Sequence, residues 1–491
     1  MDFICACLLV FFWYVRPQDI FAVISGVSVV KYAMYVGIIA TVRRAGGFSR
    51  AIVWAVPMDW LVTAYCVWAI YATADHTGAF KEVFTYFSFH MVTALALNSW
   101  AKIEKYLNIW LGCLAVLAVL AVSSHWDVEL VKGSAELTMA FHDRLTLNTW
   151  VFRNPNALGH GVVTLIPAAL AWWVMAGGKN KMLGIALIAL AIHCVLLTES
   201  KGAFLAGAGG LTMLFLFKRP VWLQLVLLAL VYGLGIAALK SLPRMDTLSK
   251  DDEGIQGRMI VWQQAKFSME STVTGEGLKT FQGYVSIRDS KLHRTVYIQI
   301  ATHGSYVRHG ADLGYMGLLL FAGIFYGGVR VLLVAQSVPG SEAMRVQRTL
   351  YALIATTVFS CWVVDRAYHM DFFLLSGVIS AFHRRFLPGN KGQEEDGGKT
   401  EALGGAESTP LELSATAGGA PADEQRSEAL AGTRRQETED EEETAENTPD
   451  QFGAINLNWS RIGVVDMMIM YVILEVLLYF WELFSTDFVV F

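Results

Sequence analysis

The sequence predicts an all-α fold, a polytopic helical bundle with about twelve transmembrane helices and a possible thirteenth near the C-terminus. Three observations predict it. The chain of 491 residues is 54% hydrophobic and only 16% charged, whereas about a quarter of the residues of soluble domains are charged. Its mean hydropathy is +0.44. Apolar runs of roughly 17–25 residues, the length that a membrane-spanning helix needs, recur along the chain.

Taken in order, the expected spans alternate with polar loops, and the basic residues of the short loops fall on one side. The expected spans cover residues 3–15, 20–41, 51–72, 83–99, 106–123, 158–176, 182–198, 202–217, 220–240, 311–334, 349–364 and 371–383. The basic residues on the common side are Arg43, Arg44, Arg50, Lys102, Lys105, Lys179, Lys181, Lys218, Arg219, Arg345, Arg348, Arg384 and Arg385. Short loops rich in Lys and Arg face the cytoplasm. We therefore predict a multi-pass protein of the bacterial inner membrane whose other loops face the periplasm.

One long polar segment and a polar tail interrupt the apolar pattern. Residues 241–310 predict a large periplasmic loop within a transmembrane domain of residues 1–387. Residues 388–456 are rich in Gly, Ala, Glu, Thr and Ser and cannot bury enough apolar surface to fold, so we expect a disordered acidic cytoplasmic linker. Residues 457–491 are largely apolar again. They predict a C-terminal helix that spans the membrane, lies in its interface or docks on the bundle.

An Arg-Asn-Pro-Asn motif begins one expected span at its periplasmic end. Pro155 ends any helix that arrives before it, and Asn156 can cap the helix that follows. In one interpretation this is only a capped helix start whose Arg153 reaches toward the interface. In the other, the free N–H groups and positive dipole of the helix start, next to Arg153, bind an anion such as a diphosphate. The residues alone leave both open.

A tight hairpin, Ser200-Lys201-Gly202, joins two expected spans on the same side. Gly202 has a structural explanation, because so short a turn between spans needs a glycine. Lys201 can pair with Glu199, but a lysine at the outer mouth of a bundle is also a potential phosphate ligand.

The long loop supplies a candidate helix and a candidate base. Arg258, Trp262 and Lys266 recur at i, i+4 and i+8, so they share one face of the predicted helix. Such a helix could rest on the bilayer, but the planar fork of Arg is the usual choice for phosphate. Beyond a Gly-Glu-Gly turn at 275–277, His303 precedes the next span. It is either a satisfied polar residue or a general base, which would need to titrate near neutral pH.

Other chemistries find no support in the sequence. The six cysteines fall in apolar runs without a Cys-x-x-Cys pair and are interpreted as packed small side chains. His-Glu-x-x-His, Walker-type and Gly-x-Ser-x-Gly motifs are absent, and we expect neither a metal nor a cofactor. Gly310, Gly314 and Gly317 are interpreted as positions where membrane helices approach closely.

In this order the motifs resemble those of the O-antigen ligase and polymerase superfamily, which includes protein-O-glycosylation ligases. They are Asn154-Pro155-Asn156 before a span, Ser200-Lys201-Gly202, Gly257-Arg258 followed by Trp262, Gly275 and Gly277, and His303 before Leu313, Gly314 and Gly317. The resemblance covers about residues 150–320. It has two departures. The hairpin carries Lys201 where the family usually has Arg, which keeps the charge but loses the bidentate fork, and Gly304 stands where an Asn commonly follows the histidine.

The resemblance implies an inverting, metal-independent glycosyltransferase with its active face in the periplasm. The donor would be a glycan on undecaprenyl diphosphate, and the acceptor a hydroxyl of lipid A-core, of another glycan or of a protein. The surroundings would be membrane lipid, with no nucleic-acid partner. His303 would take or orient the proton of the acceptor hydroxyl, and Arg258 would stabilise the leaving diphosphate. The residues expected to bind the diphosphate or the rest of the substrate are Lys201, Arg153, Asn154, Asn156, Trp262 and Arg308.

Ligase and polymerase share all of these motifs, so the sequence leaves both functions open. The alternative from another class is a lipid-linked glycan flippase or transporter, which would also have about twelve spans and polar residues near the midplane. Such a protein would not require a long periplasmic loop that carries Arg and His.

Overall fold

The described part of the computed structural model is mostly helical. It comprises residues 1–47, 49–128, 130, 144–147, 149, 152–220, 222–226, 253–289, 294–338, 340–387 and 459–486. Within these ranges the only strands are the two of one antiparallel hairpin. The prediction of a helical membrane protein is confirmed at this level. The expected linker, residues 388–456, lies entirely outside the described residues.

The helical elements are α1 (Asp2–Tyr14), α2 (Pro17–Ile20), η1 (Ala22–Ile24), α3 (Val29–Ala45), α4 (Arg50–Val53), α5 (Pro57–Tyr71), α6 (His76–Ala96), α7 (Trp100–His125), α8 (Pro155–Val163), α9 (Leu165–Ala169), η3 (Leu170–Val174), α10 (Lys181–Thr198), α11 (Lys201–Leu216), α13 (Glu253–Ser271), α14 (Ser305–Val334), α15 (Glu342–Val363), α16 (Met370–Arg384) and α19 (Val464–Thr486). Strand β1 (Gly283–Asp289) pairs with β2 (Arg294–Ile300), so that Gly283 lies opposite Ile300.

Five helical segments of the described chain are long and apolar enough to cross a membrane. They are α7, the continuous segment α8–α9–η3, α10, α14 and α19, and the apolar helices α1 and α11 are shorter. The expected number of about twelve spans therefore stays a prediction. The span expected at 220–240 lies mostly outside the described residues, which stop at 226 and resume at 253.

Two expected spans are interrupted by turns. The span expected at 51–72 is divided into α4 and α5, because the chain turns before Pro57, which begins α5 at the position where its missing N–H is not needed. The Val56 N–H donates to Asp59 Oδ2 (3.1 Å) and closes this first turn. The span expected at 20–41 becomes a regular α-helix only at Val29, after a bend that contains Gly26.

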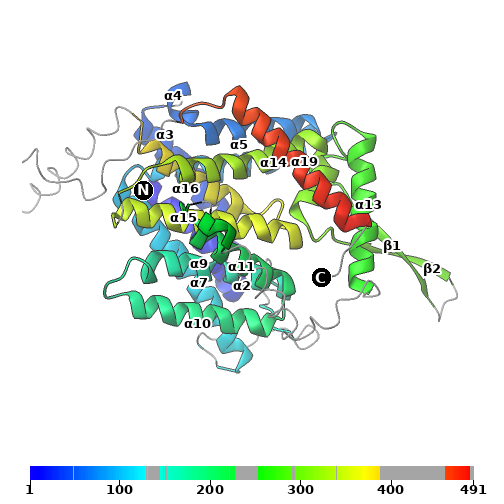
Figure 1. Ribbon diagram of the computed structural model, residues 1–491, viewed down its shortest axis with the longest axis horizontal. Coiled ribbons are helices and arrows are strands. Elements are labelled where there is room, and N and C mark those ends of the chain that lie inside the picture. Colours follow the sequence, from blue (N-terminus) through cyan, green and yellow to red (C-terminus); the bar gives the residue numbers. More distant parts are fainter. Residues whose placement is uncertain are drawn as a thin grey trace, which may run out of the picture.

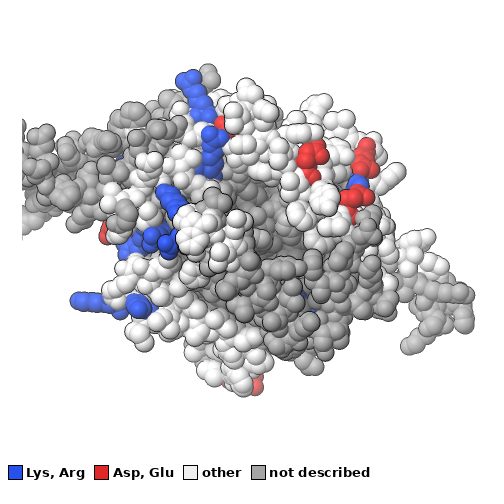
Figure 2. Space-filling view, in the orientation of Figure 1, with Lys and Arg blue, Asp and Glu red and all other residues white. Residues whose placement is uncertain are grey.

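The helices pack side by side in a bundle with chemically different ends (Figure 1). Helix α11 packs on α15, α6 on α16, and α14 on both α5 and α15. Helix α13 and the β1–β2 hairpin lie at one end, and α19 crosses α14 to reach α13. Figure 2 shows most of the visible Lys and Arg side chains over the opposite half of this face. A helical membrane protein is expected to have this charge asymmetry, and the assignment of the α13 end to the periplasm stays a prediction.

The turn after α13 packs directly on the backbone of α14 and fixes the two helices relative to each other. The Gly277 N–H donates to the Asp312 carbonyl oxygen (2.7 Å). Gly314 has φ 67° and bends α14, and a Cβ on it would lie 2.2 Å from the carbonyl oxygen of Val273. Gly314 is therefore required for a bend and a close turn, which differs from the helix–helix contact expected of it. Gly310 does lie at such a contact, with α19.

Candidate functional site

Two arginines and two histidines from four separate segments converge near the start of α13. Arg258 comes from α13, His160 from α8, His303 from the loop before α14, and Arg366 from the turn between α15 and α16. Arg258 lies close enough to act electrostatically on both histidines, and Arg366 on His160. Arg366 Nη1 also donates to the carbonyl oxygen of His160 (3.3 Å). The structure thus gathers positive charge around two histidines, a combination suited to an anionic ligand.

The turn that carries Arg366 is fastened to the loop that carries His303. The Arg366 N–H donates to Ser305 Oγ (2.9 Å), and Thr302 Oγ1 donates to Asp365 Oδ2 (3.2 Å). The Arg366 guanidinium forms an ion pair with Asp371, and its side chain is 9% exposed. A buried ion pair holds its members in one geometry, because separating them leaves a charge in a poorly solvated place. Arg366 is consequently a rigidly positioned cation.

His303 is a strained and half-buried histidine. Its φ of 51° lies in the left-handed region, which residues other than glycine rarely adopt. Such strain persists where the surrounding structure enforces it and is often found at functional sites. Burial first, and then the positive charge of Arg258, lower the pKa of His303 from 6.5 to about 4. At neutral pH the imidazole is therefore uncharged and able to accept a proton.

Trp262, predicted as a substrate-binding residue, holds the loop that carries His303, and its role in substrate binding stays a prediction. Its indole is 9% exposed, and its Nε1–H donates to the carbonyl oxygen of Thr302 (2.6 Å). A Cβ on Gly304 would lie 3.3 Å from the Trp262 ring and 3.3 Å from the carbonyl oxygen of Trp362. This crowding gives a physical reason for a glycine at the position where the family commonly has an asparagine.

The start of α8 differs by two residues from the prediction. The helix is capped by Asn154, whose Oδ1 accepts from the Asn156 N–H (2.8 Å), and Pro155 is the first helical residue. Asn156, expected to be the cap, instead accepts a hydrogen bond from Arg144 Nη2 (2.9 Å) through Oδ1. Proline is favoured at the first helical position because it lacks an N–H and has a preset φ. Arg153 is exposed beside this helix start.

The hairpin before α11, which carries Lys201, packs tightly on α8 through Gly202. The left-handed turn is made by Glu199, with φ 46°, and not by Gly202 as expected. Gly202 is needed for packing, since a Cβ there would lie 2.9 Å from His160 Nε2. Arg144 Nε donates to the carbonyl oxygen of Thr198 (2.8 Å) and so ties the hairpin to the start of α8.

Arg308 belongs to a polar network centred on Asp312, one helical turn further along α14. Arg308 Nε lies 2.7 Å from Asp312 Oδ2, which also accepts from the Tyr368 hydroxyl (2.7 Å). Asp312 Oδ1 accepts from the Phe281 N–H (2.7 Å). This network joins α14, the turn before α16 and the segment before β1. Its geometry makes Arg308 a structural partner of Asp312, and a role of Arg308 in substrate binding stays a prediction.

Two members of the cluster were missed by sequence reasoning. Arg366 had a signal, because its short turn is predicted to lie on the periplasmic side, which the positive-inside bias depletes of basic residues. His160 had none, since a histidine inside an apolar run is usually a hydrogen-bonded packing residue. Its Nδ1 does bond to Ser360 Oγ (2.9 Å), while its buried Nε2 has no hydrogen-bond partner in the described chain. Among the described residues no three His, Cys, Asp or Glu side chains come together as a metal site.

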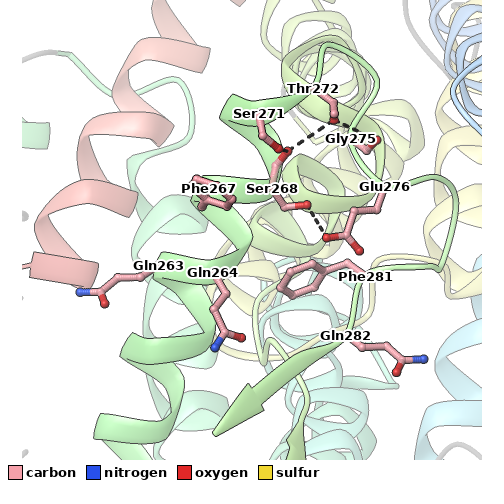
Figure 3. Close-up of a pocket in the computed structure, with 10 residues that line it drawn as sticks. All are labelled: Gln263, Gln264, Phe267, Ser268, Ser271, Thr272, Gly275, Glu276, Phe281 and Gln282. Carbon is pink, nitrogen blue, oxygen red and sulfur yellow. Dashed lines mark hydrogen bonds between the residues drawn. The ribbon is translucent and has the colours of Figure 1, made fainter.

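A separate open groove of about 680 Å³ lies on another face of α13 (Figure 3). It is lined by Gln263, Gln264, Phe267, Ser268, Ser271, Thr272, Gly275, Glu276, Phe281 and Gln282. Its walls carry hydroxyl, amide and carboxylate groups beside the rings of Phe267 and Phe281, and Figure 3 shows Ser268 Oγ donating to Glu276 Oε1 (2.5 Å) along one side. None of the predicted site residues lines it. The groove and the cationic cluster nevertheless share α13.

Comparison with known proteins points to the same region. Residues 185–322 match the family model described as O-antigen ligase. This stretch contains Lys201, Arg258 and His303, together with α13 and the bend of α14. No curated protein matches the chain. The resemblance to the O-antigen ligase superfamily, indicated by the motifs, is thereby confirmed over residues 185–322.

Proposed function

We propose that this chain transfers a glycan from undecaprenyl diphosphate to an acceptor hydroxyl on the periplasmic face of the inner membrane, with inversion at the transferred sugar. One observation supports this above the others. Arg258 and His303 both lie within the stretch that matches the O-antigen ligase family, and the structure brings them close to Arg366. This end of the bundle carries few of the basic residues that are visible in Figure 2. Basic residues are normally depleted on the periplasmic side of a membrane protein, so basic residues there call for an explanation, and binding of an anionic donor supplies one.

The proposed chemistry assigns each group a part. The acceptor oxygen forms a bond to the anomeric carbon while the bond from that carbon to the diphosphate oxygen breaks, and its electron pair leaves with the diphosphate. The hydroxyl proton passes to His303. Arg258 and Arg366, with Lys201 nearby, stabilise the negative charge that grows on the diphosphate. The leaving group then needs no protonation, and the proposal assigns no step to a metal ion.

His303 suits this step best when the donor is bound. With a pKa of about 4 it is neutral but only weakly basic in the free protein. A diphosphate placed against Arg258 would offset the positive charge that helps to lower this pKa, and would therefore make the imidazole more basic. Donor binding would thus activate the base.

We assign the groove beside α13 to sugar units of the donor or the acceptor. Sugars offer hydroxyls to amides and carboxylates, and C–H faces to aromatic rings. The groove provides the amides of Gln263, Gln264 and Gln282, the carboxylate of Glu276, and the ring of Phe267, which is 74% exposed. An exposed aromatic ring among polar groups is typical of a binding surface.

The test of this proposal is glycan transfer in a deletion strain that is complemented with wild type or variants. Arg258→Ala and His303→Ala should abolish transfer while the protein still reaches the membrane in normal amount. Lys179→Ala, which changes an exposed residue in the loop before α10, is the matched control and should transfer normally. Full transfer by both site variants would mean that the catalytic assignment is wrong.

The same strains distinguish the possible reactions. In the deletion strain, long glycan chains that remain on the lipid carrier, with none on the final acceptor, indicate a ligase. Single repeat units that are transferred without growing into chains indicate a polymerase. Normal glycan on both carrier and acceptor would contradict the transferase proposal and return attention to a transporter.

A further inference from the structure

A second groove lies at the opposite end of the bundle from α13, where α11 ends and α15 begins. Its volume is about 390 Å³. Three cations line it: Lys218 and Arg219, which follow α11, and Arg348 in the second turn of α15. The rest of the lining is largely apolar and includes Leu214, Phe215, Phe217 and Met344. The groove therefore combines positively charged and apolar lining residues.

The three cations of this groove are not neutralised by carboxylates of the described chain. The nearby Arg345 forms ion pairs with Glu104 and, at 3.8 Å, with Glu342, but no such pair involves Lys218, Arg219 or Arg348 within the described ranges. Burial and then the charge of Arg348 lower the pKa of Lys218, as expected when like charges lie close together. Gathered cations without counter-charges are stabilised when an anion joins them.

The backbone holds Lys218 over the groove. Lys218 has φ 54°, in the left-handed region that a lysine rarely adopts. Its Nζ donates to the carbonyl oxygen of Ala335 at the end of α14 and lies 5.5 Å from the centre of the Phe217 ring. One hydrogen bond leaves two of the three ammonium donors available. The position of this cation is thus determined by the fold and not by free rotation of an exposed chain.

We propose that this groove binds the headgroup phosphate of an anionic phospholipid from the adjacent membrane leaflet. The phosphate would lie among Lys218, Arg219 and Arg348. An acyl chain would run over Phe215, which is 47% exposed. The apolar wall favours a lipid over a free phosphate, because only the lipid has an acyl chain that can contact it. Basic residues near a bilayer attract anionic lipids, by about fivefold in affinity for each charge.

The test is native mass spectrometry of the full chain released from nanodiscs that contain phosphatidylglycerol and phosphatidylcholine at equal amounts. Wild type should retain phosphatidylglycerol in preference to phosphatidylcholine. The triple variant Lys218→Gln, Arg219→Gln, Arg348→Gln should lose this preference, with an affinity for phosphatidylglycerol lower by on the order of 100-fold, as three charges at this strength imply. The control variant Lys179→Gln, Lys181→Gln, Arg43→Gln removes three exposed cations outside the groove and should bind as wild type does.

Three results would overturn the proposal. The triple variant could keep its preference for phosphatidylglycerol, the control variant could lose it equally, or inorganic phosphate at millimolar concentration could displace the lipid completely. The last result would indicate a site for a soluble phosphate compound. Because the groove lies away from the His303 cluster, failure here would leave the proposed glycan transfer untouched. A Phe215→Ala variant, which removes the exposed apolar ring and keeps the three cations, gives an independent check. It should retain less phosphatidylglycerol than wild type, and unchanged retention would contradict the contact with an acyl chain.

Discussion

At the scale of single residues, His303 shows how the surroundings set a chemical role. Its sequence context permits either a packed histidine or a base. The structure gives it a left-handed backbone, a neighbouring guanidinium and an environment that keeps it neutral. These features follow from Arg258 and Trp262, which lie about forty residues earlier in the chain, and so no local motif could have supplied them.

The pH dependence of transfer should report this environment. A protonated imidazole cannot accept a proton, so activity should fall as pH falls through the pKa of His303. In the free protein this pKa is about 4, and the acidic limb of kcat/KM should lie near pH 4 and not near 6.5. The limb of kcat, which reports the donor complex, should lie at higher pH. Protein returned from acid to pH 7 must recover its activity, and a kcat/KM limb near 6.5 would contradict the effects of burial and of Arg258.

At the scale of elements, the position of α13 depends on contacts at both of its faces. One is the turn after it, which contacts the bend of α14 at Gly314. The other is α19, whose Trp481 Nε1–H donates to the carbonyl oxygen of Trp262 (3.1 Å) and whose Glu482 forms an ion pair with Lys266. Lys266, which shares a predicted helix face with Arg258, is therefore engaged with the C-terminal helix.

A pair of glycine substitutions should separate the bend of α14 from ordinary helix packing. Gly314→Ala places a methyl group 2.2 Å from the Val273 carbonyl oxygen on a backbone with φ 67°, and should destabilise the protein by about 3 kcal/mol or more. Gly112→Ala, inside α7 where a Cβ meets open space, should stabilise it by about 0.5–1 kcal/mol. Thermal unfolding in detergent, followed by tryptophan fluorescence, measures both. Equal unfolding temperatures for the two variants would show that the bend is not required.

Removal of the indole that joins α19 to α13 should disturb the site from a distance. Trp481 is 2% exposed, and Trp481→Ala should destabilise the protein by about 3–5 kcal/mol and lower kcat/KM as α13 loses its support. Tyr479→Ala on the same helix changes a ring that is 65% exposed and should alter stability by less than about 0.5 kcal/mol. Both quantities are measured on purified protein. If the two variants behave alike, α19 does not support α13.

At the scale of the whole molecule, charge is distributed between the two ends of the bundle. Most basic side chains in view gather away from α13, while Arg366, which is paired with Asp371, and Arg258 lie near the start of α13. The same asymmetry separates the proposed glycan site from the proposed lipid groove. One end would therefore act on a lipid-linked substrate, and the other would bind the membrane itself.

Cysteine labelling tests this orientation directly. Val273→Cys, in the turn after α13 where Val273 is 77% exposed, should react in intact cells with a maleimide that cannot cross the inner membrane. Lys179→Cys, at the other end, should react only after the cells are opened. The native cysteines give little background, because five are buried and Cys7 is half-buried. The reverse labelling pattern would place α13 in the cytoplasm and contradict the proposed site of transfer.

The sequence by itself determined the class of fold and the helix that carries Arg258, and it named His303 as a candidate base, a role that stays a prediction. Hydropathy, helical spacing and motif order are properties of the sequence itself, so they can be recognised without knowledge of tertiary contacts. Only the tertiary structure decided that Arg366 and His160 join this cluster, that Trp262 supports a loop, and that Asn154 caps α8. It also decided that Gly202 and Gly314 serve close packing and a bend. Except for the local cap at Asn154, these properties depend on which segments distant in the sequence pack against each other, and packing of the whole bundle decides that.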